Sequence, residues 1–205
     1  MNCPFCHYSN TNMILYKNSL TYIIPDFSPL ALGHLLILPY KHIHGIANAD
    51  DTTILDINRS ISYVQDLYSD GQGMFFEHGA IMTSTAGSSV DHAHLHFLPI
   101  LVDIKLLLAE QNFDLKKIIP IGSLSELQMF SIQRQPYIYW RYFNGDGFAY
   151  PVKRLKSQFL RTVIGKTINE FNDYNWHSDA LTKRAKELVI QTIDDWNMRR
   201  ERVGK

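Results

Sequence analysis

Three histidines recur at every second position near the middle of the chain, at His92, His94 and His96, with apolar residues between them. In an extended strand alternate side chains point to opposite faces. This spacing therefore predicts a row of imidazoles on one face and an apolar surface on the other. A helix would scatter the imidazoles around its axis and lose the pattern. We expect residues 92–98 to form a strand that presents the three histidines together.

Such a row is better explained by function than by stability. Each buried imidazole needs hydrogen-bond partners, and every unmade bond costs about 1–3 kcal/mol. Two kinds of chemistry suit the pattern. Three imidazoles can hold a catalytic metal ion, or one can act as a nucleophile while the others orient it and stabilise charge.

The only two cysteines, Cys3 and Cys6, have the spacing of a zinc or redox motif. A thioredoxin-type pair opens a helix after a strand, and no strand-forming run precedes Cys3. Zinc is therefore favoured over redox chemistry. Two thiolates are half of a tetrahedral zinc site, so two further ligands are needed, and an incidental pair of thiols is the alternative.

The composition places the chain among ordinary globular proteins. It has 205 residues, 45% hydrophobic and 20% charged, with a formal net charge of zero. A zero net charge argues against a surface for duplex nucleic acid, which needs a basic excess. No run approaches the ~18 apolar residues of a membrane span, and the first residues do not resemble a signal sequence. We expect a cytoplasmic protein with no membrane partner.

Strand-forming runs and one amphipathic helix surround the histidines in the first half of the chain. Asp50 or Asp51 can cap the start of that helix. The order predicts an α+β fold with a mostly antiparallel sheet and flanking helices. The expected elements are a hairpin over residues 13–24, a strand over 33–39, a helix over 51–68, a strand over 74–77, a loop over 83–89 and the histidine strand over 92–98.

The second half of the chain has a different pattern, with more helix and an aromatic hairpin. We expect residues 1–100 to form one domain and residues 101–205 to form an α/β C-terminal extension. The elements expected in the extension are helices over residues 103–111, 123–133, 157–168 and 180–200, and a hairpin over 137–153 with its turn at 144–147.

Two motifs in residues 3–100 together resemble the histidine triad (HIT) superfamily of nucleotide hydrolases and transferases. The first is the line His-φ-His-φ-His-φ-φ, with φ apolar, at residues 92–98. The second is the line at residues 26–39, which is similar to the nucleoside-binding loop and following strand of the family. The resemblance implies a HIT-like fold for the first half of the chain.

The resemblance also implies catalytic roles. His94, the middle histidine, would be the nucleophile that attacks the α-phosphorus and forms a nucleotidyl-histidine intermediate. His96 would donate a hydrogen bond to a non-bridging phosphate oxygen, and Ser89 would lie near the bridging or leaving oxygen. Neutral imidazole suits this role, because it is nucleophilic near pH 7 without further activation.

Further residues are implied to bind the nucleotide. Asp26 would accept hydrogen bonds from the ribose hydroxyls, and Phe27 would line the base pocket. Ser88 and Glu77 would lie near the phosphates. A carboxylate at that position is unfavourable unless it meets a cation, a ribose hydroxyl or a substrate amine.

In zinc-bearing members of the family, two histidines complete the site begun by the cysteine pair. The matching residues are Cys3, Cys6, His42 and His92, with His44 as the alternative to His42. Four protein ligands around zinc make a structural site, not a catalytic one. Such a site would fix His92 and with it the strand that carries His94.

The leading interpretation is a nucleotide hydrolase that acts at the α-phosphate of a nucleoside phosphate ester, anhydride or phosphoramidate. The alternative within the family is a nucleotidyltransferase or phosphorylase that passes the nucleotidyl group to phosphate or to a metabolite. A catalytic metal held by His92, His94 and His96, and a non-catalytic nucleotide-binding protein, are the remaining hypotheses. A homodimer is a further expectation from the family.

Overall fold

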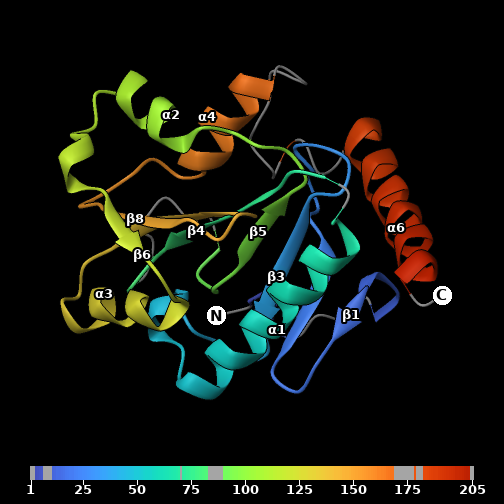
Figure 1. Ribbon diagram of the computed structural model, residues 1–205. Helices are drawn as coiled ribbons and strands as arrows, with labels where there is room; N and C mark the ends of the chain where they lie inside the picture. Colours follow the sequence, from blue (N-terminus) through green and yellow to red (C-terminus); the bar gives the residue numbers. More distant parts are fainter. Residues whose placement is uncertain are drawn as a thin grey trace.

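An antiparallel sheet runs through the protein (Figure 1). The computed structural model describes residues 3–6, 11–69, 71–82, 90–168, 178 and 182–203. Within these ranges the sheet has eight strands in the order β1-β2-β3-β5-β4-β7-β8-β6. The strands are β1 (Tyr16–Lys17), β2 (Thr21–Pro25), β3 (Leu35–Pro39), β4 (Met74–Gly79), β5 (Leu95–Leu98), β6 (Ile119–Ile121), β7 (Tyr137–Tyr142) and β8 (Gly147–Pro151).

Helices cover both faces of this sheet. On one face α1 packs beside α6, and on the other α2 packs beside α4 (Figure 1). None of the helices in the described ranges is long and apolar enough to span a membrane. The helices are α1 (Asp51–Leu67), α2 (Ile104–Glu110), α3 (Gln128–Ile132), α4 (Phe159–Ile168) and α6 (Lys183–Val203), with short 3₁₀ helices η1 (Thr11–Met13), η2 (Ile46–Asn48), η3 (Leu115–Lys117) and η4 (Leu124–Leu127).

The α+β fold class predicted from the sequence is confirmed, and the sheet continues past residue 100. β4 lies between β5 and β7, and it pairs with β7 along its whole length, from Met74 opposite Tyr142 to Gly79 opposite Tyr137. The domain boundary expected at residue 100 therefore falls inside one sheet. Strands from both halves of the chain share the layer that carries the histidines.

The two faces of the sheet have separate cores because successive side chains in a strand alternate between faces. On β4, Phe75 belongs to the core beneath α1 and α6, while Met74 and Phe76 belong to the core beneath α2 and α4. We call these the α1 face and the α4 face. A third cluster around Phe5, on the N-terminal segment, extends the α4 face over β2 and β3.

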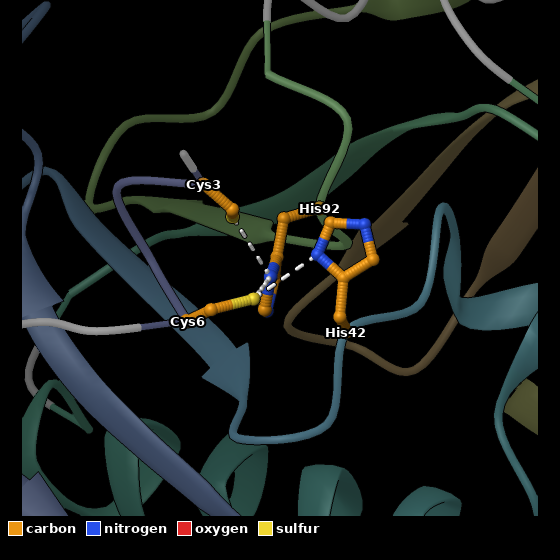
Figure 2. Close-up of side chains that lie close together, drawn as sticks. All are labelled: Cys3, Cys6, His42 and His92. Atoms are coloured by element: carbon orange, nitrogen blue, oxygen red, sulfur yellow. Dashed lines mark hydrogen bonds between the residues drawn. The ribbon is translucent and has the colours of Figure 1, made fainter. Parts of the chain in front are cut away.

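The histidine strand is shorter than the sequence predicted. β5 begins at Leu95, so His92 and His94 precede it. The chain leaves the sheet here to bond to the loop after β3: the Ala93 N–H donates to the Ile43 carbonyl at 2.7 Å. His92 lies beside Cys3 and Cys6 (Figure 2). The prediction of one strand over residues 92–98 was wrong for its first half.

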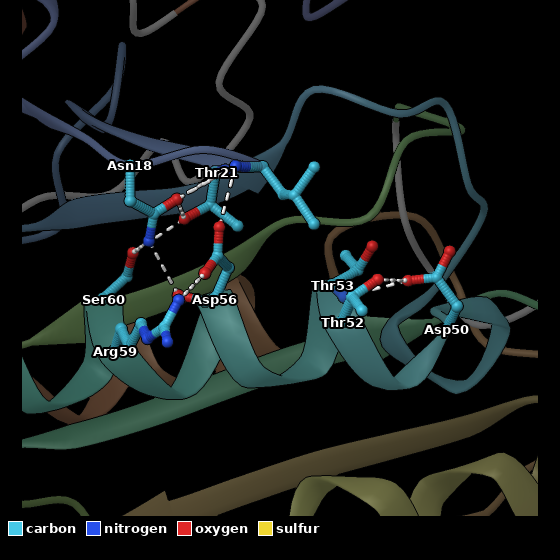
Figure 3. A network of polar contacts seen from close by, with 9 residues as sticks. Asn18, Thr21, Asp50, Thr52, Thr53, Asp56, Arg59 and Ser60 are labelled. Atoms are coloured by element: carbon cyan, nitrogen blue, oxygen red, sulfur yellow. Dashed lines mark hydrogen bonds and ion pairs between the residues drawn. The ribbon is translucent and has the colours of Figure 1, made fainter.

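A partly buried polar network fixes the β1–β2 hairpin to α1 (Figure 3). The Asn18 side-chain oxygen accepts from the Thr21 N–H at 2.8 Å, and its amide donates to Ser60 at 3.2 Å. The Asp56 carboxylate accepts from the Leu20 N–H at 2.8 Å. The turn between the strands is thus held by side chains of α1, which positions β2 and the residues that follow it.

The remaining helices and strands follow the sequence with small shifts at their ends, and the loop expected over residues 83–89 lies outside the described residues. Asp50 caps α1, as expected, by accepting from the Thr53 N–H at 2.9 Å. The aromatic hairpin forms as β7 and β8, and the four helices of the extension appear as α2, η4 with α3, α4 and α6. β6 was not predicted: it is a short edge strand that pairs with β8.

Candidate functional site

The four residues expected to bind zinc converge from three parts of the chain (Figure 2). Their ligand atoms all lie within 4.8 Å of one another. The Cys6 sulfur is 3.1 Å from His42 Nδ1, and His92 Nδ1 lies 3.4 Å from the Cys3 sulfur and 3.5 Å from the Cys6 sulfur. A tetrahedral zinc ion separates its sulfur and nitrogen ligands by about 3.6 Å, so this donor set fits zinc.

The tautomer of His92 also suits a metal ligand. Its Nε2 lies 2.8 Å from the Pro39 carbonyl, which only accepts, so Nε2 carries the proton and Nδ1 presents its lone pair to the cluster. Of the two histidines after β3, His42 contributes to the cluster, whereas His44 lies outside it. The structure therefore brings His42, and not His44, to the cysteines.

His94 has the geometry of a free nucleophile. Its Nδ1 donates to the His92 carbonyl at 2.7 Å, which leaves a lone pair on Nε2. Burial lowers the pKa of His94, so the ring is neutral near pH 7. The orientation of the ring depends directly on where the backbone of His92 lies. This carbonyl links the cysteine–histidine cluster to the candidate nucleophile.

His96 has the opposite tautomer, which is set by a chain of hydrogen bonds through His34. The Leu30 N–H donates to His34 Nδ1 at 3.0 Å, so neutral His34 carries its proton on Nε2. That nitrogen lies 3.0 Å from His96 Nδ1 and donates to it. The proton of neutral His96 is then on Nε2, which is buried and has no partner among the described residues. His94 and His96, 4.9 Å apart between ring centroids, thus offer an acceptor and a donor side by side.

The proton assignment requires both rings of this chain to be neutral. Burial lowers the pKa of His34 to about 4 and the pKa of His96 well below its usual value. A protonated pair would also place two N–H groups face to face at 3.0 Å. The stacking of His96 on Phe76, 4.4 Å between centroids and nearly parallel, holds the ring in this orientation.

Asp26 lies beside the two histidines and is paired with Arg161 of α4. Arg161 Nη1 donates to the Asp26 carboxylate at 2.8 Å, while His34 Nε2 and His96 Nδ1 are each 3.4 Å from it. Burial alone raises the pKa of Asp26, but the Arg161 guanidinium and the imidazoles hold it well below its usual range. Asp26, His34 and His96 are spaced closely enough to hold a metal, yet the guanidinium already supplies the cation there.

A pocket opens between these polar groups and an aromatic wall. Phe5 and Phe27 form the wall, with ring centroids 6.1 Å apart and nearly parallel planes. The cavity has a volume of about 90 Å³, well below the roughly 300–1,000 Å³ of typical ligand pockets, so a nucleoside requires the wall to move. The polar residues that line the pocket, among those the structure describes, are Asp26, His94, His96 and Arg161.

The expectation that Glu77 faces the phosphates is corrected by the strand register. Phe76 lies opposite His96, so these two side chains share the α4 face and Glu77 points to the α1 face. Its carboxylate accepts from the Ile46 N–H and the Tyr137 hydroxyl, both at 2.7 Å. Burial raises the pKa of Glu77 to about 7. Ser88 and Ser89, the other residues expected near the phosphates, lie outside the described residues.

Two residues on the α4 face were missed by sequence reasoning. His78 lies two positions beyond Phe76, and its Nε2 accepts from the Leu160 N–H of α4 at 3.0 Å. Arg161 is only 4% exposed. The available signal was the position of Arg161 among buried apolar residues of an amphipathic helix, because a cation buried there requires a partner.

The arrangement also bears on the hypothesis of a catalytic metal. His92 belongs to the cysteine cluster, and among the described residues His92, His94 and His96 do not form a metal-ligand group. The nucleophile interpretation is the one that the geometry supports.

Comparisons with known proteins agree with the resemblance seen in the sequence. The family described as the HIT domain matches residues 8–100. An uncharacterized HIT-like protein of Borreliella burgdorferi is 30% identical over 105 residues, which cover 48% of this chain and 75% of that protein.

Two solved structures illustrate the range of the similarity. A zinc-bound histidine triad family protein from Mycobacterium smegmatis is 22% identical with a TM-score of 0.41, covering 49% of this chain and 76% of that one. Yeast Ap4A phosphorylase Apa2 in complex with AMP is 15% identical with a TM-score of 0.47, covering 74% of this chain and 64% of that one.

Proposed function

This chain belongs to the histidine triad (HIT) family, and on that premise we propose that it is a nucleotide hydrolase acting at the α-phosphate. Its substrate is a nucleoside phosphate ester, anhydride or phosphoramidate. The observation that carries the proposal is the hydrogen bonding of the two rings beside one pocket. These bonds assign a lone pair to Nε2 of His94 and an N–H to Nε2 of His96.

The reaction proceeds in two displacements. His94 Nε2 attacks the α-phosphorus, a P–N bond forms, and the bond from phosphorus to the leaving group breaks. Water then attacks the same phosphorus and loses one proton, which neutralises the departed leaving group. The P–N bond breaks, a nucleoside monophosphate leaves and the lone pair returns to His94. His96 Nε2–H donates to a non-bridging oxygen, where negative charge develops in both transition states. Ser89 is assigned to the leaving oxygen.

The nucleotide is held on the two sides of the pocket. Phe27 contributes apolar surface for the base, and Asp26 accepts from the ribose hydroxyls while it remains next to Arg161. Ser88 contributes near the phosphates. Glu77 has no part in this assignment, because its carboxylate lies on the α1 face.

Zinc has a structural role in this proposal. Cys3, Cys6, His42 and His92 hold it as a closed tetrahedral site, which supplies no open position for substrate. By fixing His92 the site also fixes the carbonyl that orients the nucleophile. A cytoplasmic, reducing location keeps both thiols available for the metal.

Transfer of the nucleotidyl group to phosphate is the second candidate. A buried guanidinium at the pocket favours an anionic acceptor over water. Products separate the two: with phosphate present, a hydrolase still releases only the nucleoside monophosphate, whereas a phosphorylase releases the diphosphate.

The test is to trap the intermediate. The protein is mixed with a panel of adenosine and guanosine substrates that carry oxygen and nitrogen leaving groups, quenched within milliseconds to seconds, and analysed by peptide mass spectrometry. We expect a nucleotidyl adduct on the peptide that contains His94, and none in His94→Asn. Turnover of a panel substrate by His94→Asn at the wild-type rate contradicts the proposal. Light scattering of the same preparation tests the proposed homodimer.

A further inference from the structure

The first turn of α4 contacts the histidine site at several points, although it lies in the half of the chain that the HIT domain match does not reach. The Leu160 N–H donates to His78, and Arg161 donates to the Asp26 carboxylate at 2.8 Å. Arg161 Nη2 also donates to the carbonyl and the hydroxyl of Ser28. The guanidinium is therefore held in one place from three directions.

Two residues that line this pocket each carry a buried donor without an acceptor among the described residues. Arg161 Nε and His96 Nε2 both have no hydrogen-bond partner within the described part of the chain, and both residues line the cavity. Arg161 is 4% exposed and His96 is 2% exposed. Buried polar atoms are normally satisfied, so two unpaired donors at one cavity point to a ligand rich in acceptors.

The charges of the pocket lead to the same ligand. Asp26 and Arg161 are the acidic and the basic side chain among the described lining residues, and they form an ion pair at 2.8 Å. Without Arg161, a buried carboxylate would face any phosphate that entered. Removing one partner of a buried ion pair leaves an uncompensated charge, which here repels an anionic ligand.

We propose that Arg161 is the residue that makes this pocket select a nucleotide over a nucleoside, by binding the phosphate group together with His96 and by neutralising Asp26. The inference rests on the proposed function, because it assigns a nucleotide to the same pocket. It adds to that function a phosphate-binding residue from α4.

A second arginine provides a matched control. Arg184, at the start of α6, also reaches the loop after β2: its Nη1 lies 3.3 Å from the Pro29 carbonyl and its Nη2 lies 3.5 Å from the Leu30 carbonyl. It does not line the pocket. If Arg161 only held the loop in place, Arg184→Gln would affect ligand binding in the same way as Arg161→Gln.

The experiment measures binding to the full chain in the His94→Asn background, which prevents turnover. Calorimetry is run with the four ribonucleoside 5′-monophosphates and with the four corresponding nucleosides. We expect Arg161→Gln to weaken binding of the monophosphate about tenfold or more, and binding of its nucleoside by less than about threefold, since a charged hydrogen bond is lost only with the phosphate. Arg184→Gln should leave the ratio of the two affinities unchanged.

The other outcomes overturn either the inference about Arg161 alone or the proposed function as well. If Arg161→Gln weakens binding of the monophosphate and of the nucleoside equally, the ratio of the two affinities is unchanged. This result overturns the inference and leaves the proposed function standing. No binding of any of the eight compounds to His94→Asn overturns both. If Arg161→Gln does not fold by circular dichroism, Arg161→Lys is used: it keeps the charge and loses the Nε donor, and it must still weaken the monophosphate more than the nucleoside.

Discussion

Asp26 and Glu77 are both buried carboxylates, one on each face of the same sheet, and their pKa values move in opposite directions. The Arg161 guanidinium and nearby imidazoles hold the pKa of Asp26 far below its usual range against the effect of burial. No cation contacts Glu77 within the described residues, and burial raises its pKa to about 7. Burial alone does not determine the charge of a carboxylate; the presence of a cation does.

The α1 face and the α4 face of the sheet also differ in whether these buried polar groups have hydrogen-bond partners. On the α1 face both oxygens of Glu77 accept hydrogen bonds, and the polar network of Asn18 and Asp56 is paired. On the α4 face His96 and Arg161 keep donors unpaired at a cavity. We therefore expect changes on the α4 face to act on ligand binding and turnover, and changes on the α1 face to act on stability.

The largest effect is expected at His94, the proposed nucleophile. His94→Asn should reduce kcat by several powers of ten, because the covalent route through Nε2 is lost. The midpoint of thermal unfolding should change little, since the change affects one hydrogen bond, to the His92 carbonyl, and the ring contacts with Phe5 and His96. Initial rates and melting curves are compared with those of Glu77→Gln, which should keep activity at neutral pH. Equal loss of activity in both variants would break the contrast between the faces.

Loss of the metal site should come next. Cys6→Ser removes one of the four proposed zinc ligands, and we expect the bound zinc to fall from about one per chain and stability to drop by several kcal/mol. Activity should fall with it, because His92 positions His94. Metal content and melting temperature are the measurements. His44→Asn is the control, since His44 lies outside the cluster, and it should retain zinc.

Glu77 should make stability depend on pH. Its native pKa of about 7 lies above its ordinary value of 4.5, so the native state holds a proton that the unfolded chain releases between these values. The contribution of Glu77 to stability is therefore present below about pH 4.5 and is lost as pH rises through 7, by up to about 3 kcal/mol. Urea unfolding at pH 5 and pH 8 should show this loss in the wild type but not in Glu77→Gln. A loss of the same size in both would assign it to another group.

The smallest effect is expected at the start of α1. Asp50→Ala removes the cap on the Thr53 N–H and should cost about 1 kcal/mol in the free energy of unfolding, with activity unchanged. Asp51→Ala, which removes a neighbouring carboxylate that does not cap, is the matched control. A reduced kcat in Asp50→Ala would show that the α1 face is coupled to the site.

Local patterns in the sequence predicted most of the fold. The hairpin expected over residues 13–24, the cap at Asp50 and the aromatic hairpin each depend on residues close together in the chain, and each is found as expected. β6 was missed because a short edge strand with a central proline gives little periodic signal.

The sequence predicted the site residues that belong to a local motif. It did not predict features of the site that depend on pairing between strands far apart in the chain. His94 and His96 follow from their spacing, whereas the orientation of Glu77 depends on which residue of β4 lies opposite His96. The start of β5 at Leu95 depends on the bond between Ala93 and Ile43. Such pairings join residues far apart in sequence, so periodicity within one segment cannot supply them.

The position of β4 beside β7 has a consequence for truncation of this protein. A chain that stopped near residue 100 would expose the whole of β4 as a free edge, with unpaired N–H and C=O groups from Met74 to Gly79. Open edges of this kind template strand addition and aggregation. The half that matches the HIT domain is therefore expected to be insoluble as an isolated fragment.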